Sequence, residues 1–211
     1  GRYLADHIPS ARMLELRGDY HSSWDPVDIA MWREAVIDFI AGDLGAGAVT
    51  DRVLASVLFT DIVSSTEVAA RLGDTAWHSL LDVHDRAAAS LVDRIGGRFV
   101  KGTGDGVLAT FDGPSKAISC GQALMGELRA HGIEIRAGVH TGEIEIRGDD
   151  IAGVGVVIAS RICDRADGGD VLVSRTVKDL VAGSRLVLAD RGSHELKGLD
   201  EPWHLYAVVA D

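Results

Sequence analysis

From Val53 onward, short apolar runs alternate with longer amphipathic stretches, and this alternation constrains the fold more than any other feature of the sequence. The run VLASVLFT predicts a buried strand, and residues 77–95 place their apolar side chains on one helical face. The segments RFVK and GVLATF predict a hairpin that turns through residues 102–106. Groups of strands interrupted by two long helices predict an α+β sandwich, with helices on one face of a largely antiparallel sheet.

The remaining elements continue this order. Residues 115–130 predict a second long helix, and residues 133–147 predict a strand or a pair of strands. Residues 155–163 predict a third helix, VLVS at residues 171–174 a short strand, and residues 203–209 a final strand.

The segment GDLGAGAVTD, residues 42–51, has the composition of a linker, because glycines and alanines stand between apolar segments. It predicts a boundary between residues 1–50 and a domain that spans residues 51–211. In the first part, residues 12–16 predict a short strand and residues 28–40 a helix, which together are too small to bury a core alone.

The stretch LELRGDYHSSW places His21 after a strand-like run and before the expected helix. On this pattern, residues 1–50 resemble the C-terminal end of an α/β-hydrolase, in which a late strand and turn deliver the triad histidine. No G-x-S-x-G nucleophile elbow occurs in the 211 residues, so a histidine base would have no serine to activate. We therefore interpret His21 as a remnant or an ordinary turn histidine and reject a hydrolase function.

The acidic composition narrows the range of partners. The 32 Asp and Glu against 21 Lys and Arg give a formal net charge of −11, which argues against a nucleic-acid binder, since such proteins present a basic face. A nucleotide substrate is compatible, because bound metal cations can supply positive charge. No apolar run approaches the ~20 residues that span a bilayer and no leader-like segment opens the chain, so we expect no membrane partner. Cys120 and Cys163 are expected to be free thiols in the cytoplasm.

Asp61 follows the buried strand directly, in the stretch FTDIVSST. Val63, Ser64, Ser65 and Thr66 are expected to begin a helix, so their backbone N–H groups would point toward the carboxylate. This arrangement suits a metal-bound triphosphate, because the acid takes the cation and the amides take phosphate oxygens. The alternative is that Asp61 only caps the helix.

Asp105 lies in KGTGDG, at the tip of the expected hairpin, where the glycines allow a tight turn and a close approach of a ligand. The alternative is an ordinary turn aspartate. A hairpin tip beside the end of the strand would bring Asp105 next to Asp61, and two such acids repel each other unless cations lie between them. The pairing therefore favours Mg²⁺ or Mn²⁺.

The stretches FTDIVSST, KGTGDG, IRAGVHTGEI, DIAGVGVVIASR and ELKGL occur in this order. On these motifs, residues 53–209 resemble the catalytic domain of class III nucleotide cyclases and are most similar to the bacterial adenylate cyclases of that class. The resemblance covers about three quarters of the chain. It implies a ferredoxin-like α+β sandwich with a mostly antiparallel sheet covered by helices.

The resemblance also implies catalytic roles. Asp61 and Asp105 would hold two divalent metal ions, with the carbonyl of Ile62 as an extra ligand. The ribose 3′-oxygen of ATP would attack the α-phosphorus in line, and pyrophosphate would leave. Arg161 would stabilise charge on the α-phosphate in the transition state, and Lys197 would hold the terminal phosphates.

Lys101 and Asp150 would select the purine by the same resemblance. A lysine that donates to adenine N1 and an aspartate that accepts from the N6 amino group read adenine, whereas guanine reverses this pattern. Guanylate-type members place glutamate and a small residue at these positions, so the combination predicts ATP. The alternatives are an ordinary surface salt bridge, or a guanylate cyclase or cyclase with weak purine choice.

Val157 departs from the family pattern. Four residues before the arginine, family members usually have an asparagine, which orients the ribose. Because valine cannot hydrogen-bond, we expect looser ribose positioning and a modest rate. The corresponding alternative is a catalytically silent domain that binds nucleotide as a sensor.

Family members form head-to-tail dimers that share two sites between the subunits. One subunit supplies the metal-binding aspartates, and the other supplies the purine pair, the arginine and the phosphate lysine. Because this chain carries both halves, the resemblance implies a homodimer with two equivalent sites. An upstream regulatory domain is a further expected partner.

Overall fold

The computed structural model describes residues 52–209, which lie within a unit that spans Thr50–Asp211. Three expectations lie outside the described residues: the interpretation of His21, the strand and helix expected within residues 1–50, and the boundary near residue 50.

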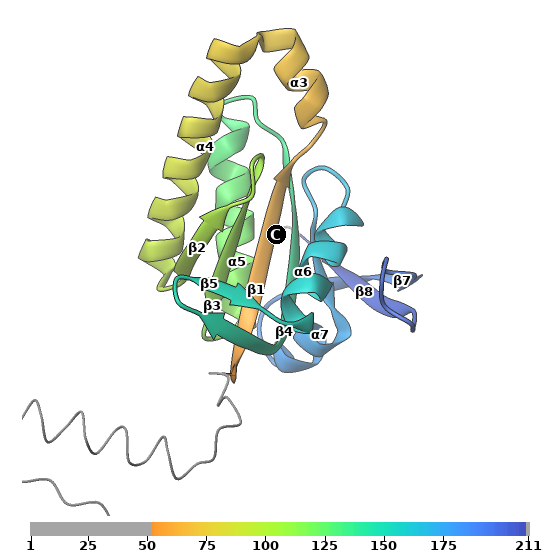
Figure 1. The fold of residues 1–211 in the computed structure, drawn as a ribbon. Coiled ribbons are helices and arrows are strands. Elements are labelled where there is room, and N and C mark those ends of the chain that lie inside the picture. Colours follow the sequence, from red (N-terminus) through yellow and green to blue (C-terminus); the bar gives the residue numbers. More distant parts are fainter. Residues whose placement is uncertain (1–51, 210–211) are drawn as a thin grey trace, which may run out of the picture. The chain divides into compact units, whose positions relative to one another are not determined.

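Thirteen helices and strands make up the described part, drawn in Figure 1. The helices are α3 (Ser65–Leu72), α4 (Asp74–Ile95), α5 (Pro114–Arg129), α6 (Val154–Asp164) and α7 (Arg175–Leu180). The strands are β1 (Arg52–Ile62), β2 (Arg98–Gly102), β3 (Gly106–Phe111), β4 (Ile135–Arg147), β5 (Asp150–Ala152), β6 (Val171–Ser174), β7 (Leu188–His194) and β8 (Trp203–Val208).

The strands of the described residues form one eight-stranded sheet in the order β2-β3-β1-β4-β6-β8-β7, with β5 paired to β4. Strands β4 and β6 run parallel, and the other pairs described are antiparallel. The fold is therefore mixed α+β with a mostly antiparallel sheet, as the sequence predicts.

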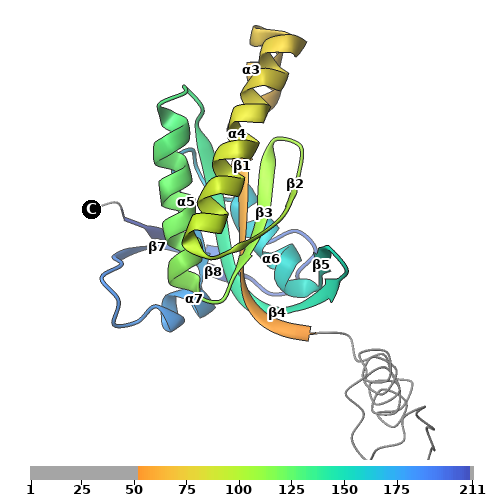
Figure 2. The ribbon, with the colours of Figure 1, turned by 90° about the vertical axis from the view of Figure 1, so that its left-hand side faces the viewer.

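Helices α4 and α5 cover one face of this sheet, and α6 with β5 covers part of the other. The larger core cluster joins Leu58 and Val107 to buried residues of α4 and α5. A smaller cluster on the opposite face joins Val57 and Leu108 to Ala159 of α6. Figure 1 shows α6 and β5 in front of the sheet and α5 behind it, and Figure 2 shows α4 and α5 together on one side. The two long helices, α4 and α5, thus lie on one face as predicted, and α6 adds a helix on the other face.

The backbone of α6 lies unusually close to β4, and a glycine makes this approach feasible. A Cβ on Gly138 would stand 2.3 Å from the nitrogen of Cys163 and 2.6 Å from the carbonyl oxygen of Ala159. Any larger residue would therefore have to push α6 away from the sheet. This contact fixes the height of α6, and of Arg161 on it, above the central strands.

Most predicted elements are confirmed. Of the two alternatives for residues 133–147, the structure has the single strand, which begins at Ile135. The helix expected from Val63 begins at Ser65. Helix α7 and strands β5 and β7 were not predicted. Helix α7 has only six residues and β5 only three, and the side chains of β7 are mostly exposed and follow no apolar alternation.

Two expectations about the whole chain can be compared with the described part. None of the helices within residues 52–209 is long and apolar enough to cross a membrane. Cys120 and Cys163 are both free and buried, as expected for unpaired thiols.

Candidate functional site

Asp61 occupies the next-to-last position of β1, on the face of the sheet that α6 covers. In the antiparallel pairing it lies opposite Gly106 of β3 and opposite Arg136 of β4. Its neighbour Ile62 belongs to the core under α4 and α5. Because successive side chains of a strand point to opposite faces, Asp61 is directed away from that core.

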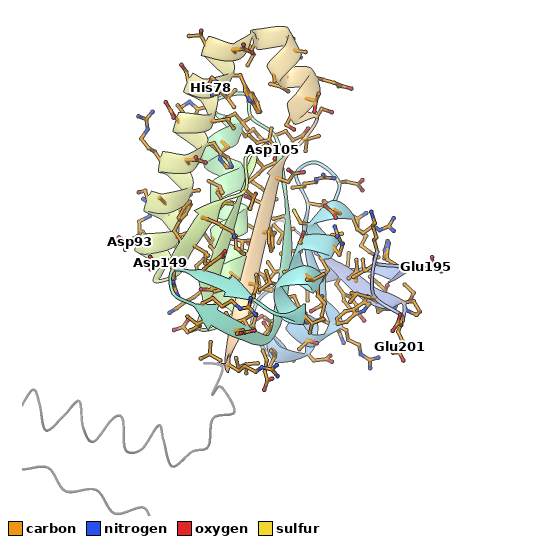
Figure 3. The ribbon with its side chains drawn as sticks, in the orientation of Figure 1. His78, Asp93, Asp105, Asp149, Glu195 and Glu201 are labelled. Carbon is orange, nitrogen blue, oxygen red and sulfur yellow. The ribbon has the colours of Figure 1, made fainter. Side chains whose placement is uncertain are left out.

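The turn between β2 and β3 brings Asp105 beside the end of β1. The Ile62 N–H donates to the carbonyl oxygen of Asp105 at 2.9 Å, and the Thr103 N–H donates to the carbonyl of Gly106 at 2.8 Å. A Cβ on Gly106 would stand 1.9 Å from the Thr60 carbonyl oxygen, so this position requires glycine. Figure 3 labels Asp105 at the tip of the turn, below α3. The structure thus brings the two predicted acids together.

Arg136 lies beside the acidic pair, and it was not among the residues predicted from the sequence. Its Nε and Nη2 donate to Oδ2 of Asp61 at 2.9 and 2.5 Å, and its Nη1 donates to the carbonyl of Asp164 at 3.4 Å. The available signal was a charged residue at the start of the strand, next to the apolar residues 137–139. Only the register of β1 against β4 shows that it faces Asp61.

Burial, Arg136 and Asp105 all change the pKa of the Asp61 carboxyl. Burial has the largest effect and raises this pKa above the ordinary value, the hydrogen bond from Arg136 lowers it, and the negative charge of Asp105 raises it. The net direction of the Asp61 pKa is upward, chiefly because of burial and with a contribution from the charge of Asp105. Asp105 has its own partner, because the Ser65 hydroxyl donates to its Oδ2.

The acidic pair fits a divalent cation that shares its ligands with a substrate. Within residues 52–209, no group of three or more His, Cys, Asp or Glu side chains could enclose a metal ion. Asp61 and Asp105 offer carboxylate oxygens only. Magnesium is commonly held by one or two carboxylates together with substrate phosphates and water, and a cation would relieve the repulsion between the two acids.

The start of α3 supplies backbone amides next to the acids. Ser64 has a φ of 52°, in the left-handed region, and the helix begins at Ser65. The Val63 N–H already donates to the carbonyl of Glu134 at 2.9 Å, so of the residues expected to hold phosphate, Ser64, Ser65 and Thr66 are the better placed. A cleft of about 420 Å³ adjoins them, lined by Ser65, Thr66, Ala69, Trp77, Leu81, Gly104 and Asp105.

Lys101 and Asp150 are brought together from β2 and β5. The Lys101 Nζ donates to Asp150 Oδ2 at 2.5 Å, and the two side chains are 48% and 50% exposed. The hydrogen bond from Lys101, and after it the one from the Ile151 N–H, lowers the pKa of Asp150. A cationic donor and an anionic acceptor therefore stand side by side at an accessible position.

Arg161 lies on α6 and reaches the loop that carries Lys197. Its Nε donates to the Lys197 carbonyl at 3.2 Å, and its Nη1 donates to Asp164 Oδ2 at 3.0 Å. Leu196 is 2% exposed and anchors this loop, which leaves the Lys197 side chain in solvent. A cleft of about 510 Å³ runs along residues 195–202 and Arg165; Glu195 and Glu201 mark it in Figure 3.

Val157 and Val154 precede Arg161 on the same stripe of α6. They are 43% and 63% exposed, which is high for valine. Val154 and Val157 are three residues apart, and Val157 and Arg161 are four residues apart, so all three side chains lie on one helical face. Apolar surface therefore adjoins the arginine where the resemblance implies an asparagine.

His140 of β4 is buried. Its Nδ1 lies 2.8 Å from the hydroxyl of Ser174, and its ring meets Trp203 edge-on at 5.5 Å. Burial lowers the pKa of His140 to about 4, so the ring is neutral near pH 7. It belongs to the interior of the fold.

Comparison with known proteins identifies relatives of this chain. The family described as "Adenylate and Guanylate cyclase catalytic domain" matches residues 50–209. The protein named "Putative adenylate cyclase 3" from Rhizobium meliloti (strain 1021) is 33% identical over 165 residues, which cover 74% of this chain and 28% of that protein. This chain thus spans little more than a quarter of that relative's length.

Solved structures agree on the fold. The crystal structure of the adenylyl cyclase CyaB from P. aeruginosa superimposes with a TM-score of 0.70 at 27% identity, over 76% of this chain and 96% of that one. The guanylate cyclase domain of RhGC from Catenaria anguillulae, in complex with GTP, has a TM-score of 0.67 at 22% identity, over 74% and 96%. The second likeness concerns the fold alone.

Proposed function

This chain belongs to the family of adenylate and guanylate cyclase catalytic domains, and we propose that it is an adenylate cyclase that converts ATP to 3′,5′-cyclic AMP and pyrophosphate. The observation that carries the choice of ATP is the contact of Lys101 Nζ with Asp150 Oδ2 at 2.5 Å. Adenine presents an acceptor at N1 next to a donor at N6, which this donor and acceptor can satisfy together. Guanine presents O6 and N1–H there, so it would leave both groups mismatched.

The acids of the turn and of β1 bind the metal. Asp61 and Asp105, with the carbonyl of Ile62, would hold two divalent ions, Mg²⁺ or Mn²⁺, which when bound lower the pKa of the ribose 3′-hydroxyl and offset the triphosphate charge. Arg136 orients the Asp61 carboxylate, since two guanidinium nitrogens of Arg136 donate to one oxygen of that carboxylate. Ser65 does the same for Asp105 through its hydroxyl.

The remaining residues position the triphosphate. The amides of Ser64, Ser65 and Thr66 take phosphate oxygens at the start of α3. The 3′-oxygen attacks the α-phosphorus in line, the bond from this phosphorus to the oxygen of the leaving pyrophosphate breaks, and Arg161 stabilises the charge on the α-phosphate. Lys197 holds the terminal phosphates. To do so, Arg161 exchanges its contact with Asp164 for the substrate.

The active assembly in this proposal is a homodimer that shares its sites between subunits. Val154 and Val157 support it, because they expose apolar surface on the face of the sheet that also carries the proposed site. In the dimer, one subunit contributes Asp61 and Asp105, and the other contributes the purine pair with Arg161 and Lys197. Residues 1–50 form a separate preceding segment in this proposal, and a regulatory domain upstream would act by shifting the dimer equilibrium.

A competition assay tests the proposed reaction. With Mn²⁺ and equal concentrations of ATP and GTP, the protein is expected to form mainly cyclic AMP and pyrophosphate, with a specific activity that rises with protein concentration until the dimer is saturated. Product identity is read by chromatography, and dimer formation by sedimentation. Cyclic GMP as the main product would contradict the choice of ATP. ATP binding without either product, in a sample that is dimeric, would support the silent sensor instead.

The Val157→Asn variant is expected to raise kcat with ATP about tenfold, because an amide can hydrogen-bond the ribose and reduce misplacement of the reacting atoms. Val157 is 43% exposed, so the change leaves the core intact. The matched control is Val187→Asn, an exposed valine just before β7 that is 56% exposed and belongs to neither the site nor the proposed dimer surface, which should leave kcat unchanged. Equal rates for Val157→Asn and the unchanged protein would show that position 157 does not orient the ribose.

A further inference from the structure

Strand β2 contains a β-bulge that changes the face on which Lys101 lies. The register against β3 shifts between Phe99 and Lys101, so Val100 is an extra residue. In a regular strand, residues an odd number apart lie on opposite faces, and Arg98 and Lys101 would point to opposite sides of the sheet. The bulge directs both toward the turn between β4 and β5.

Arg98 binds this turn directly. Its Nη2 donates to the carbonyl of Gly148 at 3.2 Å. Arg147 pairs with Asp150, so Gly148 and Asp149 form a two-residue turn, and Gly148 has a φ of 61°, as at the first central position of a type II′ turn. The carbonyl between the two central residues of such a turn makes no bond across the hairpin. Arg98 is therefore the partner of that carbonyl, and Asp149 marks the place in Figure 3.

The orientation of Asp150 depends on where this turn lies. Its Oδ1 accepts from the Ile151 N–H at 2.8 Å, and its Oδ2 accepts from Lys101 at 2.5 Å. Ile151 is 6% exposed and packs in the core beside β1 and β3. The Asp150 carboxylate is thus hydrogen-bonded to the backbone of the β4–β5 hairpin. A movement of the turn between these strands would therefore move the carboxylate away from Lys101.

The contact of Lys101 with Asp150 cannot hold the turn by itself. Both side chains are about half exposed, and such ion pairs contribute little because water screens them. A second attachment three residues earlier on the same strand restrains the turn at two points. The guanidinium donates to the carbonyl with a defined direction, so it adds a directed bond to the ion pair.

We propose that Arg98 is a positioning residue for purine selection, which holds the turn at Gly148 so that Asp150 and Lys101 meet the same base. The inference rests on the proposed function, in which these two residues read adenine. Arg98 itself touches neither the base nor the phosphates in this proposal. It acts through the turn, and its loss should affect the choice of nucleotide more than the chemical step.

The test compares Arg98→Ala with Arg98→Lys. For Arg98→Ala, the ratio of kcat/KM for ATP over that for GTP is expected to fall about tenfold, mainly through a higher KM for ATP, with the Mn²⁺ concentration at half-maximal rate unchanged. Arg98→Lys should recover most of the ratio, because a single donor can still reach the carbonyl. A ratio that stays unchanged in Arg98→Ala overturns the inference.

Amide hydrogen exchange supplies a readout that does not depend on activity. Exchange at the Ile151 N–H, which donates to Asp150, should become several-fold faster in Arg98→Ala. The matched control is Arg94→Ala, which removes an exposed arginine from the last turn of α4 and should change neither exchange nor the ratio. An equal effect of Arg94→Ala, or unchanged exchange in Arg98→Ala, overturns the inference. Faster exchange in a protein that forms no cyclic nucleotide would reject the proposed function and keep the positioning role.

Discussion

Asp61→Asn and Asp105→Asn are each expected to lower kcat for cyclic AMP formation at least about a thousandfold. Asparagine keeps the shape of the side chain and removes the charge that holds the cation. Metal ions contribute several kcal/mol of transition-state stabilisation, and about 1.4 kcal/mol corresponds to a factor of ten in rate. The measurement is the rate of cyclic AMP formation at saturating ATP over a titration with Mn²⁺.

The control for these variants is Asp112→Asn. Asp112 lies just after β3 and pairs with Lys116 on the exposed first turn of α5, so this change removes one carboxylate without touching the site. It should retain full activity. The Asp61→Asn protein should also remain folded, because its amide oxygen can still accept from Arg136. Activity of Asp61→Asn within tenfold of the unchanged protein would contradict the metal assignment.

The double variant Lys101→Glu/Asp150→Ser is expected to prefer GTP, with the ratio of kcat/KM for ATP over GTP falling at least about a hundredfold. Glutamate can accept from guanine N1–H, whereas adenine N1 would face a second acceptor, and each mismatched polar group in a binding site costs about 1–3 kcal/mol. Lys101→Glu alone should lose activity with both nucleotides, because it places a second anion beside Asp150.

The matched control for the double variant exchanges an equivalent pair elsewhere. Lys116 and Asp112 form an ion pair of 2.8 Å with side chains 46% and 70% exposed, so Lys116→Glu/Asp112→Ser makes the same two substitutions on the surface. Its nucleotide preference should not change. If the double variant at residues 101 and 150 kept its preference for ATP, the reading of adenine by Lys101 and Asp150 would be wrong.

Local patterns in the sequence predicted most of the fold. VLASVLFT, the apolar face of α4 and the glycine turn of KGTGDG all depend on residues within a few positions of one another, so their periodicity is visible without the partner strands. The proximity of Asp61 and Asp105 could also be predicted, since a hairpin tip beside a strand end requires only that neighbouring strands pair. Strand β7 could not be found, because it is mostly exposed and has no apolar alternation.

The sequence by itself determined the order of strands and helices and the residue types available to bind a nucleotide. The tertiary structure alone decided which of them meet. Arg136 faces Asp61 from 75 positions away because of the register between β1 and β4, and Lys101 reaches Asp150 because one extra residue in β2 turns it to the face of β5. Register and bulges are set by packing between distant segments, where a shift of one residue reverses every face, and no local pattern records that choice.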